Sequence, residues 1–195
     1  PLIIDLLEGA SDPEGGDLSI ENLATVPPGD SVGGVTQSGD SLTIDPSGYQ
    51  HLADGESDTV QYAYDVVDEQ GQRTQQSLTI TIEGRNDAPT VDQGIDDQNA
   101  TEAVAFEFDV MADAFKDVDI SDSLTLTATL ANGDPLPAWL DFDGFTFSGT
   151  PGVDDADIEV KVTATDEGDA DGTNKLSVST NFLISVSGAN HAPVV

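Results

Sequence analysis

The stretch LTITIEGRNDAPTV at residues 78–91 returns as FLISVSGANHAPVV at residues 182–195, which is 104 positions later. Six of the fourteen positions are identical, and both copies contain the motif Asn-x-Ala-Pro. A strand-like segment that ends on the same motif at a fixed spacing indicates tandem structural units. We therefore predict two domains, residues 1–87 and residues 88–195, joined near the first motif.

The segments upstream of each copy alternate between apolar and polar residues, which is the pattern of half-buried strands. The clearest runs lie at residues 60–66, 78–82, 124–130, 158–164 and 176–186. Gly, Asp, Asn or Pro, which favour turns, stand near the ends of these runs. Residues 107–116 (EFDVMADAFK) are ambiguous between helix and strand. Many short strands with regular turn signals predict an all-β fold of two tandem antiparallel, Ig-like β-sandwiches.

Composition narrows the classes of function. The chain has 195 residues, of which 38 are acidic and 5 basic, for a formal net charge of −33. Such a surface repels phosphate backbones and anionic lipid heads, so we expect neither nucleic-acid binding nor a membrane-surface role. The sequence has no cysteine and no apolar run near the length of a membrane span, so we expect no disulfides and no membrane insertion. Because 37% of the residues are apolar and lie in ordered runs, we expect the chain to fold.

Oxygen-bearing side chains collect in loops that a sandwich would bring to one end. In a seven-stranded sandwich, the loop after the second strand and the loop after the sixth strand lie where the chain enters. The donors are Asn86, Asp87, Asp117, Asp119, Asp122 and Asp166 from the linker and the second domain, with Asp54 and Glu56 from the facing loop of the first domain. Oxygen donors without His or Cys suit Ca²⁺, so we predict a Ca²⁺ site at the junction of the domains.

The first domain repeats the pattern at its own entering end. The acids there are Asp12, Glu14, Asp17 and Asp68. We predict a second Ca²⁺ site, weaker and more exposed than the first, because the sequence holds no preceding linker for it. Each acid taken alone could equally be a solvated turn residue, since aspartate is common in turns.

The residues around the motif resemble known repeats. Asn86-Asp87-Ala88-Pro89 resembles the linker of bacterial cadherin-like repeats of the VCBS type, as do IDLLEGASDPEGGDL (4–18) and DPSGYQHLADGES (45–57). The second domain is similar to a dystroglycan-type cadherin-like domain through LPAWLDF (136–142) and FSGTP (147–151). The resemblance implies modules of large, secreted RTX-type bacterial adhesins, which bind Ca²⁺ and mediate attachment or carbohydrate contact. It also implies that the first domain lacks its first strand, because LIIDLL matches the second strand of such a repeat.

The residue types also bear on two functions other than adhesion, which are catalysis and carbohydrate binding. We expect no enzyme activity, because two histidines and no cysteine give no basis for a nucleophilic triad or a zinc site. Carbohydrate binding stays open as an alternative, because sugars stack on exposed aromatic rings. Trp139, Tyr62 and Tyr64 are expected in the core, whereas Tyr49, next to Gly48, is the expected exposed ring.

We therefore interpret the chain as a monomeric, Ca²⁺-binding extender or adhesion module of a bacterial cell-surface protein, located outside the cell. Neighbouring repeat domains of the same polypeptide are its expected partners, and Ca²⁺ is expected to rigidify the junction. The alternative is a carbohydrate-binding module of a secreted polysaccharide-degrading or attachment protein. The best candidate ligands are Asn86, Asp87, Asp117, Asp119 and Asp166, with Asp54 and Glu56 completing the shell.

Overall fold

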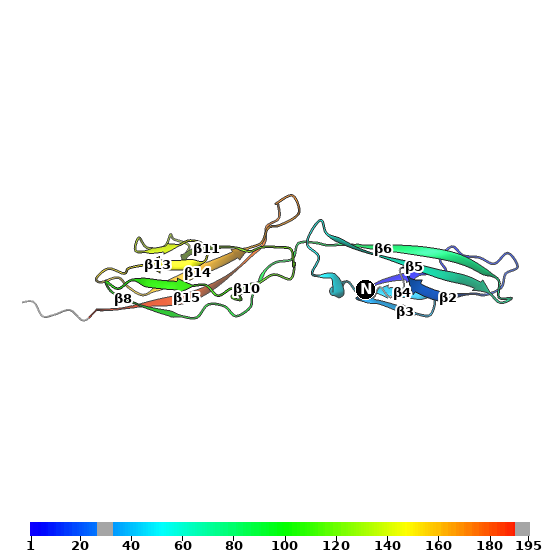
Figure 1. Ribbon diagram of the computed structural model, residues 1–195, viewed down its shortest axis with the longest axis horizontal. Coiled ribbons are helices and arrows are strands. Elements are labelled where there is room, and N and C mark those ends of the chain that lie inside the picture. The colour runs from blue at the N-terminus through cyan, green and yellow to red at the C-terminus, as the bar shows by residue number, and fades with distance from the viewer. Residues whose placement is uncertain (27–32, 190–195) are drawn as a thin grey trace, which may run out of the picture. The chain divides into compact units, whose positions relative to one another are not determined.

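Strands form where valine, isoleucine and threonine alternate with polar residues, because β-branched side chains pack well on a half-buried pleated surface. The computed structural model describes residues 1–26 and 33–189. Within these ranges the regular elements are fifteen strands and one 3₁₀ helix. They belong to two units, Pro1–Arg85 (unit 1) and Asn86–Val195 (unit 2), drawn from blue to green and from green to red in Figure 1.

Unit 1 is a sandwich of two three-stranded antiparallel sheets, with strand orders β1-β4-β3 and β2-β5-β6. The elements are β1 (Leu2–Asp5), β2 (Leu18–Thr25), β3 (Val35–Ser38), β4 (Ser41–Ile44), the 3₁₀ helix η1 (Pro46–Tyr49), β5 (Ser57–Asp68) and β6 (Arg73–Glu83). The described part of unit 1 therefore has six strands, one fewer than the seven-stranded sandwich used as the reference.

The core of unit 1 lies between its two sheets. Leu42 and Ile44 of β4 form one buried cluster with Val60 of β5 and Ile80 of β6. Tyr49, the last residue of η1, joins this cluster and is only 6% exposed. The prediction that Tyr49 is an exposed ring is therefore wrong, because η1 turns the chain so that the ring enters the core.

Unit 2 contains a four-stranded sheet, β11-β14-β15-β8, a three-stranded sheet, β12-β13-β9, and the short pair β10-β7. The strands are β7 (Thr90–Val91), β8 (Gln98–Thr101), β9 (Phe106–Asp109), β10 (Phe115–Lys116), β11 (Thr125–Leu130), β12 (Leu140–Phe142), β13 (Thr146–Gly149), β14 (Ile158–Thr165) and β15 (Ser177–Ser187). β8 runs parallel to β15, and the other pairs are antiparallel. The ambiguous residues 107–116 thus belong to two strands and the turn between them.

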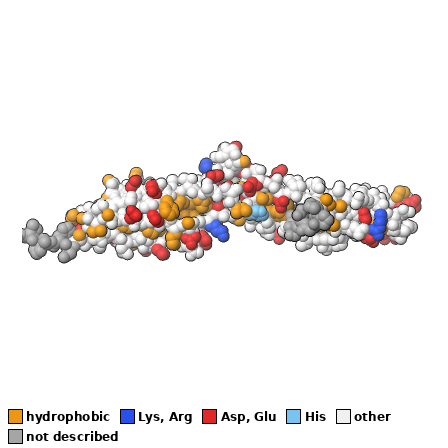
Figure 2. Space-filling view, viewed as in Figure 1, with side chains coloured by type: hydrophobic (Ala, Val, Ile, Leu, Met, Phe, Trp, Pro, Cys, Tyr) orange, Lys and Arg blue, Asp and Glu red, His pale blue; other side chains and the backbone are white. Residues whose placement is uncertain are grey.

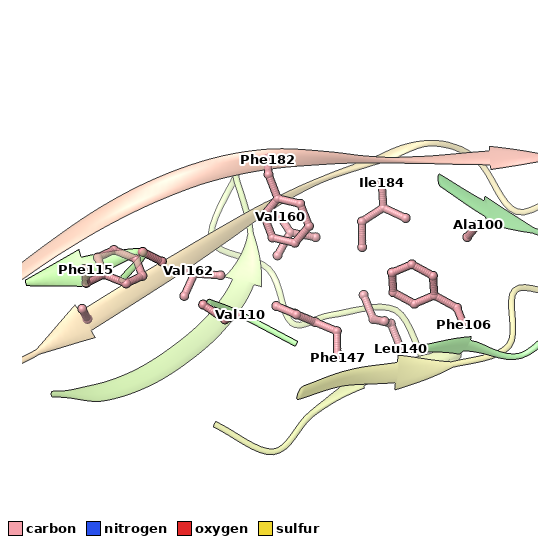
Figure 3. Close-up of a cluster of buried hydrophobic side chains, with 12 residues drawn as sticks. Ala100, Phe106, Val110, Phe115, Leu140, Phe147, Val160, Val162, Phe182 and Ile184 are labelled. Carbon is pink, nitrogen blue, oxygen red and sulfur yellow. The ribbon is translucent and has the colours of Figure 1, made fainter. Parts of the chain in front are cut away.

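Aromatic side chains fill the core of unit 2. Figure 3 shows Phe182 and Ile184 projecting from β15 towards Phe147 of the opposite sheet. The Phe147 ring is fully buried and meets the Phe182 ring edge-on, with the ring centroids 5.5 Å apart. Trp139 packs against this cluster and lies edge-on to Phe106, as the sequence predicts for a core residue. Because Trp139 is the single tryptophan, its fluorescence reports on unit 2 alone.

These sheets confirm the predicted fold class, which is all-β and built from antiparallel β-sandwiches. The second copy of the linker motif, at residues 190–193, lies outside the described residues. No helix in residues 1–26 or 33–189 is long and apolar enough to cross a bilayer.

Carboxylates dominate the charged surface. Figure 2 shows Asp and Glu side chains, in red, over the visible face and far fewer Lys and Arg side chains, in blue. The ion pairs found within the described ranges are those of Arg73 with Glu21, at 2.6 Å, and with Asp65, at 3.6 Å. Most carboxylates therefore have water and mobile cations around them, and salt screens their mutual repulsion.

Candidate metal centre

The loop between β10 and β11 turns its apolar side chains outward and its carboxylates inward. Ile120 is 77% exposed and Val118 is 42% exposed, whereas Asp119 between them is 1% exposed. This inverts the usual preference, because burying a carboxylate costs far more than burying an aliphatic side chain. Such a loop is stable only when the buried carboxylate gains hydrogen bonds, a proton or a cation.

The loop between β14 and β15 supplies a second buried carboxylate. Asp166, the first residue after β14, is 1% exposed, and its Oδ1 accepts the N–H of Leu176 at 2.8 Å. Gly168 closes this loop with a φ of +80°, and a Cβ there would lie 2.1 Å from the Thr173 carbonyl oxygen. The ammonium of Lys175 donates to the main-chain carbonyl of Asp166 at 3.4 Å, so it leaves the carboxylate oxygens to other partners.

The first two residues of unit 2 are tied to both loops. Asn86 Nδ2 donates to Asp166 Oδ2 at 3.2 Å. The backbone N–H of Asp87 donates to Asp119 Oδ2 at 2.7 Å, and the backbone N–H of Asp119 donates to Asp117 Oδ1 at 3.1 Å. The five best candidate ligands from the sequence therefore lie in one connected group within unit 2.

Part of the oxygen-donor capacity of this group is unused. Four buried side-chain oxygens of this group and of Asp122, whose N–H donates to the main-chain oxygen of Asp119, lack a hydrogen-bond partner within the part of the chain that the structure describes. They are Asn86 Oδ1, Asp117 Oδ2, Asp119 Oδ1 and Asp122 Oδ2. A buried acceptor without a partner costs roughly 1–3 kcal/mol, and more when it is charged. All four oxygens are acceptors, which a cation would satisfy together.

Burial also shifts the ionisation of these acids. Burial raises the pKa of Asp119, and the charges of Asp117 and Asp87 raise it further, although the Asp87 N–H opposes the shift. Burial and the charge of Asp117 likewise raise the pKa of Asp122. A raised pKa means that the folded protein disfavours the ionised form, which a nearby divalent cation would reverse.

The chemistry of the donors fits Ca²⁺. The group offers carboxylate and amide oxygens only, and Ca²⁺ takes 6–8 oxygens in flexible geometry. Across residues 1–26 and 33–189, no three His, Asp or Glu side chains are already gathered closely enough to hold an ion. Binding would therefore require small movements of the loop side chains, which the irregular coordination of Ca²⁺ tolerates.

Comparison with protein families identifies the fold that carries this group. The family described as "Putative Ig domain" matches residues 88–187, which is just over half of the chain. The chain belongs to this Ig-domain family. The match begins directly after Asp87 and includes both loops that carry Asp119 and Asp166. No curated protein matches the sequence.

Solved structures relate this Ig-domain chain to cadherin ectodomains. Human mucin-like protocadherin EC1-2 is similar with a TM-score of 0.51 and 12% identity, covering 91% of this chain and 86% of that chain. Human CDH23 EC21-23 is similar with a TM-score of 0.55 and 13% identity, covering 88% of this chain and 62% of that chain. Identities this low show a shared fold, so the predicted Ig-like and cadherin-like architecture is confirmed.

The acids predicted as ligands in unit 1 lie in a different setting from those of the Ig-domain match. Asp12 accepts the backbone N–H groups of Glu14 and Gly16, both at 2.9 Å, and these bonds lower its pKa. Asp68 accepts two backbone N–H groups of the turn that follows it, at 2.9 and 2.8 Å. Glu14 and Asp17 are exposed. Asp12 and Asp68 therefore stabilise turns, and a second Ca²⁺ site stays a prediction.

Asp54 and Glu56 lie in the loop between η1 and β5, where Glu56 Oε2 accepts the N–H of Ala53 at 3.1 Å. Their part in a Ca²⁺ site also stays a prediction. Asp122 was placed in the right loop but was not among the best candidate ligands. The path of the loop leaves Asp122 Oδ2 buried without a hydrogen-bond partner. Residue spacing alone does not reveal that path.

Proposed function

We propose that this chain is a Ca²⁺-dependent adhesion-type module, and that unit 2 binds the ion. The ligands are Asn86, Asp87, Asp117, Asp119, Asp122 and Asp166. When bound, Ca²⁺ supplies a divalent positive charge that neutralises the buried carboxylates and takes up their unpartnered oxygens.

The observation that carries this proposal is the inverted loop between β10 and β11. Hydrophobic burial favours Ile120 inside, yet this side chain is exposed and Asp119 is buried. The surrounding carboxylates make the cost larger, because their charges raise the pKa of Asp119 further. A cation at this point turns the unfavourable arrangement into a favourable one. An oxygen-only group selects Ca²⁺ over zinc or other metals that prefer nitrogen and sulfur ligands.

The binding of an ion by Asn86 and Asp87 would restrict the linker between the units. Arg85 is the last residue of unit 1, and these two residues directly follow it. Pro89 is buried and limits its own φ angle and the conformation of Ala88. Coordination would then remove the remaining backbone freedom at Asn86 and Asp87, so the ion rigidifies the junction.

The double variant Asp87→Ala with Asp119→Ala tests this restriction. We expect the wild type to give a narrower distribution of interatomic distances in small-angle scattering with Ca²⁺ than with chelator. We expect the double variant to give the broad distribution under both conditions, because it loses two of the proposed Ca²⁺ ligands and the acceptor of the Asp87 N–H. An unchanged distribution for the wild type on chelation, with Ca²⁺ binding demonstrated by calorimetry, would show that the ion does not stiffen the junction.

The setting of the module follows from the same proposal. Cadherin-like and Ig-like domains are typically non-enzymatic adhesion modules, so we propose an adhesive rather than a catalytic role. Millimolar Ca²⁺ outside cells matches a site of several carboxylates, so we place the module in an extracellular protein. An RTX-type bacterial adhesin with further repeat domains on the same polypeptide is the host that the linker and strand motifs favour. We also propose that the module is monomeric.

Carbohydrate binding, the alternative, has less support from the aromatic side chains. Tyr49 and Tyr62 are buried, and Trp139 packs against the core. Retention on insoluble polysaccharides, measured with Ca²⁺ and with chelator, separates the two functions. We expect no retention under either condition, because the rings of Tyr49, Tyr62 and Trp139 are engaged in the two cores. Retention that depends on Ca²⁺ would instead make the module a carbohydrate binder.

A further inference from the structure

The loop between β14 and β15 of unit 2 is longer than its counterpart in unit 1. The matching segments VVDEQGQ and ATDEGDADG align Asp68 of unit 1 with Asp166 of unit 2. In unit 1 the N–H of Asp68 donates to the Gln72 carbonyl, so the turn closes at once. In unit 2 the N–H of Asp166 donates to the Leu176 carbonyl, and the residues between them form the loop drawn in orange in Figure 1.

The longer loop changes what the aspartate carboxylate does. Asp68 Oδ1 accepts two N–H groups of its own short turn, at 2.9 and 2.8 Å. Asp166 Oδ1 accepts the N–H of Leu176 instead, and Asp166 Oδ2 accepts the amide of Asn86 in the candidate metal centre. Irregular loops open more easily than the strands beside them, so further contacts are needed to keep Asp166 in place.

Glu167, the residue after Asp166, connects this loop to the loop between β10 and β11. Its Oε1 accepts the hydroxyl of Ser123. Burial raises the pKa of Asp122, and a hydrogen bond from the main chain of Glu167 opposes that rise. Glu167 therefore contacts two consecutive residues of one ligand loop while it belongs to the other.

Lys175 holds Glu167 from the other end of the loop. Its ammonium donates to the Glu167 carbonyl at 2.9 Å and to the Asp166 carbonyl at 3.4 Å. Gly168 has a φ of +80°, and a Cβ there would lie 3.0 Å from Lys175 Cγ, so glycine leaves room for the lysine stem. Lys175 is one of 5 basic residues beside 38 acidic ones, yet its ammonium binds main-chain carbonyls here. It therefore acts on the backbone of the loop.

We propose that Glu167 is a positioning residue that, held by Ser123 and Lys175, keeps the two ligand loops where both can contact one Ca²⁺ ion. We call these three residues the clasp. The inference rests on the proposed function, because it concerns the same ion. The clasp residues are not among the proposed ligands and act through Asp122 and Asp166, which they hold. Groups that orient metal ligands without touching the metal commonly set the affinity of a site.

The clasp matters because the ligands repel one another before the ion binds. Asp117, Asp119 and Asp122 belong to one loop and Asp166 follows β14 in the other. Like charges at close range favour separation of the two loops. Loops that have separated must be ordered again when the ion binds, and that cost weakens the measured affinity. A clasp that already holds the ion-free loops together therefore lowers the Kd for Ca²⁺.

The test measures the apparent Kd for Ca²⁺ of the full chain, from the rise of the Trp139-monitored melting midpoint with Ca²⁺ concentration. Ser123→Ala removes the hydroxyl without changing any charge, and Lys175→Met removes the ammonium but keeps a stem. We expect each variant to raise the Kd about tenfold. Ser123→Thr and Lys175→Arg keep the donors, so we expect both to bind Ca²⁺ as the wild type does.

Two matched variants control for the chemical changes themselves. Ser179→Ala also removes a hydrogen bond between exposed side chains of unit 2, the one with Thr163 at 2.8 Å. Lys161→Met also removes one positive charge from unit 2, but from β14 itself. We expect neither control to weaken Ca²⁺ binding. Loss of a positive charge alone favours a bound cation, so weaker binding by Lys175→Met identifies lost positioning.

The double variant Ser123→Ala with Lys175→Met shows whether both residues act through Glu167. Two independent effects would multiply, to about a hundredfold rise in Kd. Either change alone already releases the clasp, so we expect the double variant to bind Ca²⁺ about as weakly as each single variant. In chelator we expect the midpoint of Ser123→Ala to match that of the wild type, because its hydrogen bond to Glu167 is exposed.

The outcomes separate the clasp from the proposed function. A wild type whose midpoint does not respond to Ca²⁺ overturns the proposed function and the clasp with it. A wild type that responds, together with an unchanged Kd for Ser123→Ala, overturns the clasp alone. Tighter binding by Lys175→Met, or multiplied effects in the double variant, would also overturn it, because Ser123 and Lys175 would then not act together.

Discussion

Calcium should raise the thermal midpoint of unit 2 by about 10 °C or more when unfolding is followed by Trp139 fluorescence. A ligand that binds only the folded state stabilises it by about 2.7 kcal/mol at one hundred times its Kd. For a domain of about 100 residues, each kcal/mol shifts the midpoint by roughly 4–8 °C. Ca²⁺ should have this effect because it takes up oxygens of Asp117, Asp119 and Asp122 that otherwise lack partners.

The control for this experiment must account for a net charge of −33, because salt alone screens repulsion between carboxylates. Mg²⁺ and NaCl at matched ionic strength should therefore shift the midpoint far less than Ca²⁺. Mg²⁺ requires near-ideal octahedral geometry and loses its water reluctantly, which suits an irregular group of loop oxygens poorly. Equal shifts with all three salts would contradict a specific site.

Replacement of Asp119 by asparagine should change stability in opposite directions with and without Ca²⁺. In chelator, Asp119→Asn should raise the midpoint of unit 2, because the variant removes a buried charge that the fold disfavours. With Ca²⁺, the variant should melt below the wild type and show little Ca²⁺ response, because one charged ligand is gone. Asparagine keeps an oxygen that can accept the Asp87 N–H, so the linker contact can survive.

The direction of the effect in chelator follows from the raised pKa of Asp119. A carboxyl group whose pKa is higher in the folded than in the unfolded state favours folding at low pH, and this contribution is lost as the pH rises through the folded pKa. Above the folded pKa the ionised Asp119 therefore destabilises unit 2, and a neutral isostere relieves that cost. Asp141→Asn is the matched control, because Asp141 is exposed on β12 of the same unit. A decrease with Asp119→Asn under both conditions would mean that the residue is merely structural.

The strands and the sandwich could be predicted because period-2 alternation is a local property. In a strand that alternates between apolar and polar residues, the apolar residues share one face, and that face packs on the core. Val160 and Val162 lie on such a face, and both are fully buried. Trp139 was predicted in the core from another local feature, because it stands inside the apolar segment LPAWL (136–140). Local pattern was insufficient for Tyr49, whose neighbours look like an exposed turn but form a helix that ends in the core.

The two groups of acids show where loop sequence is ambiguous. Asp12 and Asp119 both stand in acidic loops between strands, and their surroundings in the sequence are alike. The chain around Asp12 folds into a turn that satisfies both carboxylate oxygens with backbone N–H groups. The chain around Asp119 leaves Oδ1 buried without a partner. Which acids cap turns and which ones await a cation depends on backbone paths that spacing does not encode.

By itself, the sequence determined the all-β class, through alternation, and the set of loops in which the acids lie, through turn residues and topology. Only the tertiary structure decided which side chains those loops turn inward. It buried Asp119 and exposed Ile120. The physical reason is that burial is a collective property: whether a side chain meets water depends on segments far away in the chain. Alternation specifies the two faces of a strand, but the packing of other strands decides whether either face is covered.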